Sequence, residues 1–318
     1  MADNFRTASQ TALTAAAARA AHLIVDSEPV IFADELAGIL LGERADELIA
    51  YHREHGAHPV LSGARAQVTV RSRYTEDRLA ASAARGVSQY VILGAGLDSF
   101  AYRSPLARQI RVFEVDHAAS QAAKREVLSR AGIEPLGDVT YIGADFEAGS
   151  LASQLVRGGL DPSRPALVSW LGVTLYLTRD AIGQTLAGLG SLAPGSELIA
   201  DYLLPAGLRD AAGDTYAELV HPVTAEWGEP CLTLLSPADM AQLLTAHGFA
   251  VAEQAGQREA IGAALWERRD SLRPIRLSVL VRASVMAPAR EASRQAGPRR
   301  QAGPGGAAAA LRELPSAG

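Results

Sequence analysis

The sequence predicts a doubly wound α/β fold, in which a mostly parallel β-sheet is covered by helices on both faces. Short apolar runs bounded by turn residues alternate with helical stretches from residue 65 to about residue 282. Runs that are apolar on both faces are typical of parallel strands buried between helices. The first run ends in the turn Gly94-Ala95-Gly96 and the second ends in Asp116, an arrangement typical of a ligand crevice.

Seven runs have the length and the flanking turn residues of strands. The last two can also pair as an antiparallel hairpin, because the stretch between them has no regular pattern. The predicted strands span Gln89–Gly96, Ile110–Asp116, Val139–Phe146, Pro165–Val173, Glu197–Leu204, Phe249–Gln254 and Arg276–Ala283.

Composition divides the chain into three parts. Residues 1–64 show apolar positions at helical spacing and are predicted to form an N-terminal helical cap. Residues 65–286 hold the alternating strands and helices and form the main domain. Residues 287–318 are rich in Ala, Gly, Pro and Arg and are predicted to be a disordered tail, because such a composition buries little apolar area.

The charge and hydropathy of the chain exclude several classes of partner. The formal net charge is −5, so the protein as a whole does not attract nucleic acid. No apolar stretch approaches the ~20 residues of a membrane-spanning helix, and the N-terminus lacks the pattern of a signal peptide. The single cysteine, Cys231, cannot form a disulfide within the chain. A cytoplasmic protein without membrane or nucleic-acid partners is expected.

The glycine turn after the first strand is the strongest local signal. Glycines at Gly94 and Gly96 allow a sharp turn and let a ligand approach the backbone, with Ala95 between them. A dinucleotide-binding fold or a purely structural turn uses similar glycines. Ser99 stands where the dinucleotide pattern has its third glycine, which favours a ligand without a pyrophosphate.

An acid at the end of the second strand predicts a ribose contact. Glu114 and Asp116 lie on the same face of that strand, and a carboxylate can accept hydrogen bonds from both ribose hydroxyls. Asp116 is preferred because it stands at the strand end, where the crevice lies. The alternative is that an acid here only caps the helix that begins at Ala118.

Asp145 and Phe146 stand at the end of the third predicted strand. An acid there can accept a hydrogen bond from an exocyclic amine, and an aromatic ring can lie against a base. Three successive predicted strands thus end in the glycine turn, in the ribose-type acid and in this pair. Because the carboxyl ends of parallel strands lie at the same edge of a sheet, we expect all three to line one crevice.

Arg71 and Arg73 precede the first strand, and an arginine beside the crevice can bind a carboxylate with two hydrogen bonds. A nucleoside with an amino-acid tail fits S-adenosylmethionine and does not fit NAD. The alternative is that both arginines form surface ion pairs with Glu76 and Asp77. Arg71 is the preferred candidate.

At this point the string RSRYTEDRL…QYVILGAGLDSFAYR…FEVD…GADF…SWLGVTLYLT resembles the leucine carboxyl methyltransferase-type family. That group includes actinobacterial S-adenosylmethionine-dependent methyltransferases and polyketide O-methyltransferases similar to the tetracenomycin carboxyl methylase. The resemblance covers roughly residues 65 to 249. It implies a Rossmann-like class I methyltransferase sheet with an N-terminal helical cap, and S-adenosyl-L-methionine as the cofactor.

The resemblance also implies a role for each site residue. Arg71 takes the carboxylate of the cofactor, and Gly94 lies along its methionine portion. Asp116 takes the ribose. Asp145 and Phe146 take the adenine.

One position departs from the family pattern. Many members have a glutamate where Leu171 stands, before Gly172 in the fourth predicted strand. A polar contact to the amino group of the cofactor is then lost or replaced by backbone carbonyls. The pattern resembles the branch that acts on small molecules more than the branch that acts on protein C-termini, so a polyketide-type natural product is the expected acceptor.

The expected reaction is O-methylation of a carboxylate or of a phenolic hydroxyl. A carboxylate is already ionised at neutral pH and needs no base, whereas a phenol with a pKa near ~10 needs one. His221 is the candidate base, and Tyr176, Tyr202 and His221 are expected to line the acceptor pocket.

Two other functions remain open at this stage. A nicotinamide-dependent oxidoreductase would share the turn and the acid, and a non-catalytic nucleoside-binding protein would share the fold. A metal site is not expected. His52, His55 and His58 are regularly spaced, but no Asp, Glu or Cys completes a convincing set of ligands with them.

Overall fold

The computed structural model describes residues 9–144 and 151–287. Its centre is a seven-stranded sheet in the order β3-β2-β1-β4-β5-β7-β6. All pairs among β1 to β5 are parallel, and β7 runs antiparallel to both β5 and β6. This confirms the doubly wound sheet and the final hairpin. The strands are β1 (Gln89–Leu93), β2 (Arg111–Asp116), β3 (Val139–Gly143), β4 (Leu167–Trp170), β5 (Glu197–Leu203), β6 (Phe249–Ala255) and β7 (Ser278–Val285).

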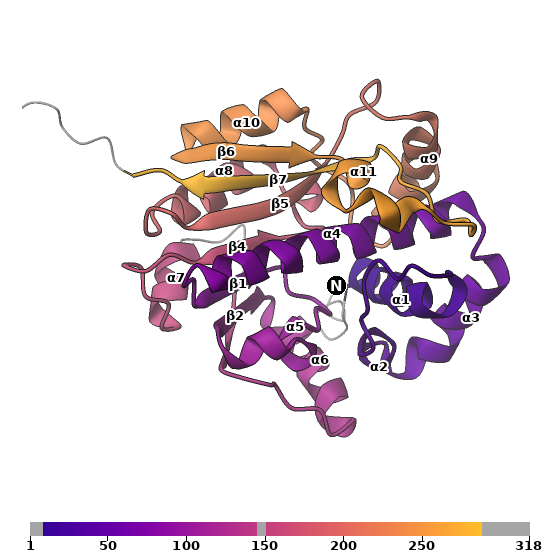
Figure 1. Ribbon diagram of the computed structural model, residues 1–318, viewed down its shortest axis with the longest axis horizontal. Helices are drawn as coiled ribbons and strands as arrows, with labels where there is room; N and C mark the ends of the chain where they lie inside the picture. Colours follow the sequence, from indigo (N-terminus) through magenta and orange to yellow (C-terminus); the bar gives the residue numbers. More distant parts are fainter. Residues whose placement is uncertain (1–8, 145–150, 288–318) are drawn as a thin grey trace, which may run out of the picture. The chain divides into compact units, whose positions relative to one another are not determined.

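Helices connect the strands and cover the sheet (Figure 1). Every residue of β1 and of β4 is buried, as expected for central parallel strands. The α-helices are α1 (Gln10–Val25), α2 (Ala37–Leu40), α3 (Ala45–His55), α4 (Pro59–Ala84), α5 (Phe100–Arg103), α6 (Ala118–Arg130), α7 (Leu151–Arg157), α8 (Arg179–Leu189), α9 (Ala211–Glu226), α10 (Pro237–Ala246) and α11 (Gln257–Ala260).

The N-terminal helices form the predicted cap region. Helix α1 packs on α3 and α4, and Ser9 starts it by accepting a hydrogen bond from the Ala12 amide at 3.2 Å. Helix α4 begins among these helices and continues for 26 residues across the sheet (Figure 1). Residue 64, where the cap was expected to end, lies inside α4. One helix therefore connects the cap helices rigidly to the sheet.

The fold creates a crevice where the strand order reverses. Strand β1 lies between β2 and β4, so the connections leave it in opposite directions and open a gap at the carboxyl ends of these strands. Helices α1, α3 and α9 lie at that end of the sheet (Figure 1). Within the described ranges, no helix is long and apolar enough to cross a membrane.

Candidate functional site

A single cavity of about 1160 Å³ occupies the crevice and extends under the cap helices. Pockets for one small ligand measure roughly 300–1,000 Å³, so this cavity has room for more than one molecule. Its walls come from the ends of β1, β2 and β4 and from helices α1, α3, α4 and α9. Six of the sequence-predicted residues lie in this lining besides His221, namely Arg71, Gly94, Ala95, Gly96, Asp116 and Tyr176.

The glycine turn forms the floor of the crevice. Gly94 and Gly96 have φ angles of 65° and 44°, in the left-handed region that favours glycine. A Cβ atom on Gly94 would lie 2.3 Å from Cγ2 of Val173, so no larger residue fits. The turn therefore needs glycine at Gly94 both for its conformation and for its close contact with the loop after β4.

Asp116 lies at the end of β2, beside the glycine turn. Its Oδ2 atom accepts a hydrogen bond from the Gly96 amide at 2.5 Å, which fixes the carboxylate in the wall of the cavity. Glu114 lies elsewhere. It is fully buried, and both of its carboxylate oxygens are 2.9 Å from Nζ of Lys124. The geometry favours Asp116 over Glu114 as the ligand-binding acid.

We expect the Asp116→Ala substitution to weaken S-adenosylmethionine binding by about 1–3 kcal/mol, because ribose hydroxyls would lose their acceptor. Titration calorimetry on the folded variant measures this difference. The Asp138→Ala variant is a suitable control, because Asp138 is exposed and pairs with Arg111 away from the cavity lining. An unchanged affinity in the Asp116 variant would remove this residue from the binding site.

Arg71 comes from the middle of α4, and its side chain is 15% exposed. Its Nη1 atom donates to Oδ2 of Asp201 at 3.3 Å. The expected alternative, in which Arg71 and Arg73 form surface ion pairs, is correct only for Arg73, which donates to Asp77 at 2.7 Å. Glu76 pairs with Arg103 instead. Arg71 is therefore held beside the crevice.

Asp201 is the principal site residue that the sequence analysis missed. It lies on β5 and is 3% exposed, and its Oδ1 atom accepts a hydrogen bond from the Gly172 amide at 2.5 Å. The same carboxylate thus orients both Arg71 and the turn after β4. The signal was an acid within the otherwise apolar run ELIADYLL. A buried acid in a central strand requires partners, and here they belong to the site.

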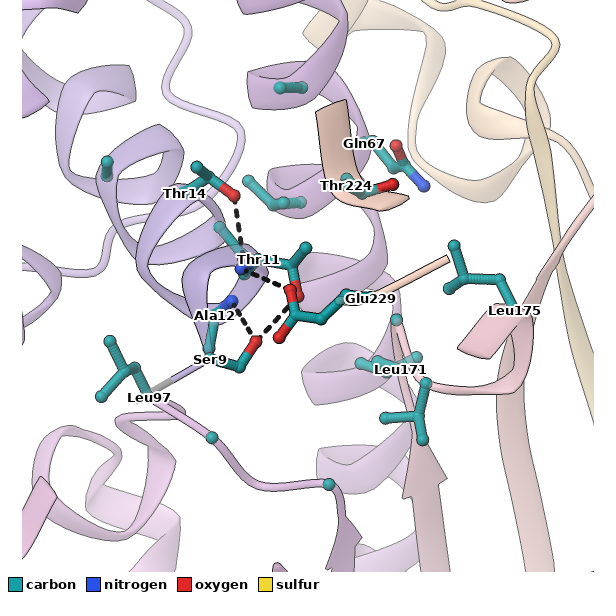
Figure 2. A pocket seen from close by; sticks show the side chains of 18 of the residues that line it. Ser9, Thr11, Ala12, Thr14, Gln67, Leu97, Leu171, Leu175, Thr224 and Glu229 are labelled. Carbon is teal, nitrogen blue, oxygen red and sulfur yellow. Dashed lines mark hydrogen bonds between the residues drawn. The ribbon is translucent and has the colours of Figure 1, made fainter. Parts of the chain in front are cut away.

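The N-terminal end of α1 closes one side of the cavity (Figure 2). The Thr11 amide donates to Oε2 of Glu229 at 3.1 Å, and a Cβ atom on Gly96 would be 3.5 Å from the Cβ of Ala12. Farther along the helix, Arg19 donates to the Leu97 carbonyl at 2.7 Å. These contacts hold the cap helix against the glycine turn, where it forms one side of the crevice.

Of the two tyrosines expected in the acceptor pocket, only Tyr176 lines the cavity. Burial raises the pKa of its phenol, so it stays a neutral hydrogen-bond donor. Tyr202 does not lie in the cavity wall, which corrects that expectation. It is 2% exposed, and its hydroxyl donates to Gln254. Successive residues of a strand face opposite ways, so Tyr202 points away from the side that Asp201 serves.

His221 lies on α9 in the cavity wall. Burial lowers the pKa of its imidazole, and the nearby Arg209 lowers it further. The imidazole is therefore neutral at physiological pH. Its Nε2 atom is enclosed and has no hydrogen-bond partner within the described part of the chain. A neutral imidazole in the cavity wall is a candidate base, although its Nε2 atom is enclosed in this structure.

The other expectations divide between described and undescribed residues. Leu171 contributes an apolar side chain to the cavity wall. Asp145 and Phe146 lie outside the described residues, as does the predicted tail from residue 288. In residues 9–144 and 151–287, no group of three or more His, Cys, Asp or Glu side chains could hold a metal ion.

Comparisons with known proteins identify the family of the chain. The model of the leucine carboxyl methyltransferase family matches residues 12–190. The Bacillus subtilis protein named "Putative S-adenosyl-L-methionine-dependent methyltransferase YktD" is 29% identical over 287 residues, covering 83% of this chain and 93% of that protein.

Two crystal structures share the fold. A DUF574 family protein from Streptomyces avermitilis has a TM-score of 0.54 at 18% identity, covering 84% of this chain and 96% of that chain. A "putative methyltransferase" from Thermobifida fusca has a TM-score of 0.52 at 21% identity, covering 83% and 96%.

The strand order with its antiparallel β7, and the crevice at the ends of β1 and β2, are those of the class I methyltransferase fold. The family match spans more than half of the 318 residues, so the chain belongs to the leucine carboxyl methyltransferase family. It is an S-adenosylmethionine-dependent methyltransferase. The name of the Bacillus subtilis relative, which matches most of this chain, indicates the same activity. This decides against the nicotinamide-dependent oxidoreductase and the non-catalytic nucleoside-binding protein.

Proposed function

We propose that this methyltransferase transfers the methyl group of S-adenosylmethionine to a carboxylate oxygen of a small molecule, of the kind found among polyketide natural products. The observation that carries the proposal is the volume and lining of the cavity, whose walls include both the crevice residues and a largely apolar set of residues from α9. A cavity of about 1160 Å³ can hold a cofactor and an acceptor side by side.

The residues of the crevice fit the cofactor. Arg71 would hold its carboxylate, Asp116 its ribose hydroxyls, and Gly94 would lie along its methionine portion. When bound, S-adenosylmethionine supplies a methyl group on a positively charged sulfur. The protein orients the acceptor oxygen toward that methyl group and excludes water from the crevice.

A carboxylate acceptor suits this environment. It is ionised at neutral pH without a catalytic base, since carboxyl pKa values lie near ~4. The reaction neutralises an anion and a cation, so a largely apolar cavity favours the transition state over the separated ions. The name of the family whose model matches the chain, leucine carboxyl methyltransferase, points in the same direction.

A phenolic hydroxyl is the second candidate acceptor, because the imidazole of His221 is neutral and the residue lines the wall. If phenols are substrates, we expect His221→Ala to lower their turnover by about 10²–10⁴-fold and to leave carboxylates unaffected. The low pKa of His221 means that turnover of a phenol is retained above pH 6.5 and lost only as the pH falls below that value. A pH–rate profile for each acceptor measures this. Equal losses for both acceptors would argue against a base.

The proposal is tested by incubating the protein with S-adenosylmethionine and a panel of aromatic polyketide acids and the matching phenols. Mass spectrometry then identifies methyl esters and methyl ethers. Production of S-adenosylhomocysteine together with a methyl ester supports the proposal. Methyl ethers alone would favour the phenol, and methylation only of peptides or amines would overturn both candidates.

A further inference from the structure

His52 lies in the cavity wall and is not needed by the mechanism above. It is part of α3 and is 5% exposed. His52, His55 and His58 are regularly spaced in the sequence, but their side chains have three different environments. His55 is exposed beside Glu54, and His58 caps the start of α4. His52 alone is a buried, cavity-lining histidine.

The neighbours of His52 determine where its proton lies. Nη1 of Arg65 is 3.3 Å from Nδ1 of His52, and a guanidinium can only donate hydrogen bonds. Nδ1 must therefore accept, which leaves the proton of the neutral ring on Nε2. Burial and the charge of Arg65 lower the pKa of His52 to about 4, which keeps the ring neutral.

Arg65 itself cannot move away. It is completely buried, and it donates to both carboxylate oxygens of Asp26 at 2.8 and 2.9 Å and to the Gly56 carbonyl at 2.8 Å. His22 holds Asp26 from the other side, at 2.9 Å. The His52 ring is thus fixed in orientation and tautomer by a rigid network.

The Nε2–H group of His52 has no acceptor among the residues that the structure describes. The Nε2 atom of His221 is fully buried without a partner, but the Nε2 atom of His52 is not among such atoms. Since His52 lines the cavity, its Nε2–H group is accessible from there. A donor that faces a cavity and has no protein partner is free to bind a ligand. Such a donor, fixed on the wall of a largely apolar cavity, is typical of a ligand contact.

The separation of His52 from the glycine turn sets the length of the ligand, and helix α1 gives a measure of it. Ala12 of α1 lies against Gly96 of the glycine turn, whereas His22 belongs to the network that holds His52. Ten helical residues separate Ala12 from His22, which corresponds to about 15 Å. The His52 donor therefore lies at the end of the cavity remote from the cofactor turn.

The walls of the acceptor region are mainly apolar. Helix α4 contributes Val60, Leu61 and Ala64, and helix α9 contributes Leu219, Val220 and Val223. These side chains offer no hydrogen bonds to a ligand and favour an apolar one. A ligand that fills this region therefore combines an apolar body with polar groups only toward its ends.

We propose that His52 is an acceptor-binding residue, and that its Nε2–H group donates to a second oxygen at the remote end of an elongated, mainly apolar acid. This proposal rests on the proposed function, because it takes the methylated group to be a carboxylate. The acceptor class is therefore an acid with a carboxylate near the cofactor and a carbonyl or carboxylate oxygen at its opposite end.

Two acids of equal length test the proposal. Decanedioic acid carries an oxygen acceptor at both ends, and decanoic acid carries one at a single end. Their affinities are measured by titration calorimetry on the full chain saturated with S-adenosylhomocysteine. We expect wild-type protein to bind the diacid about tenfold more tightly, which exceeds the twofold statistical advantage of two equal ends.

Two variants of His52 separate donation to the ligand from support of the fold. In H52N the amide oxygen replaces Nδ1 and keeps the contact to Arg65, but the donor toward the cavity is lost. In H52Q an amide group replaces the Nε2 donor. The diacid preference is expected to disappear in H52N and to be retained in H52Q.

The outcomes distinguish this proposal from the proposed function. A wild-type protein that methylates carboxylic acids but does not prefer the diacid would overturn the role of His52 alone. A diacid preference that persists in H52N would also overturn the role of His52. Failure of both acids to bind to the wild-type protein would overturn it too. A diacid preference without methylation of any acid would instead support the binding site and contradict the carboxylate reaction.

Discussion

The Arg71→Lys substitution is expected to weaken binding of S-adenosylhomocysteine by roughly 10- to 100-fold and to leave adenosine binding nearly unchanged. Lysine keeps the positive charge but loses the planar geometry that binds a carboxylate through two hydrogen bonds. Hydrogen bonds between charged groups contribute roughly 1.5–3 kcal/mol, which gives this range. Adenosine has no carboxylate, so it reports on the rest of the site. Calorimetry with the two ligands measures the difference.

Arg73→Lys is the matched control, because Arg73 is on the same helix and its partner is the exposed Asp77. That variant should bind both ligands as the wild type does. If Arg71→Lys weakens both ligands equally, Arg71 supports the fold through Asp201 rather than binding the carboxylate. If neither arginine discriminates between the ligands, the assignment of a carboxylate site beside the glycine turn is wrong.

Much of the fold could be predicted because its signals are local. The strand run QYVIL and the turn at Gly94 are adjacent in sequence, and an apolar run followed by glycines has few other structural interpretations. Asp116 could be identified for the same reason, since a residue at the end of a strand lies at the carboxyl edge of a parallel sheet. The family resemblance then supplied the cofactor.

The remainder of the site depends on contacts between distant residues. The Thr11 amide meets Glu229, which is 218 positions away, and Arg71 meets Asp201 across 130 positions. No local pattern encodes such pairs. The sequence places Tyr202 near a strand end but does not show whether its ring faces the acceptor pocket, because a strand-end aromatic can face either way until the alternation of the strand is known. The donor on His52 required the position of Arg65.

The Glu114→Ala substitution is expected to destabilise the protein by about 3–5 kcal/mol, which is the usual cost of leaving one partner of a buried ion pair alone. Both residues of the pair are nearly inaccessible, since Glu114 is 0% and Lys124 is 1% exposed. The loss would strand the ammonium group of Lys124 in the core between β2 and α6. Urea denaturation of the variant measures the change in the free energy of unfolding.

This experiment also decides which acid of β2 serves the ligand. Glu114→Ala should lower stability while the folded fraction still binds S-adenosylhomocysteine, whereas Asp116→Ala should lower affinity with little change in stability. The double variant Glu114→Leu with Lys124→Met is the control, because removing both charges avoids the stranded ion and should recover much of the stability. A Glu114→Ala variant with unchanged stability and lost affinity would transfer the ribose contact from Asp116 to Glu114.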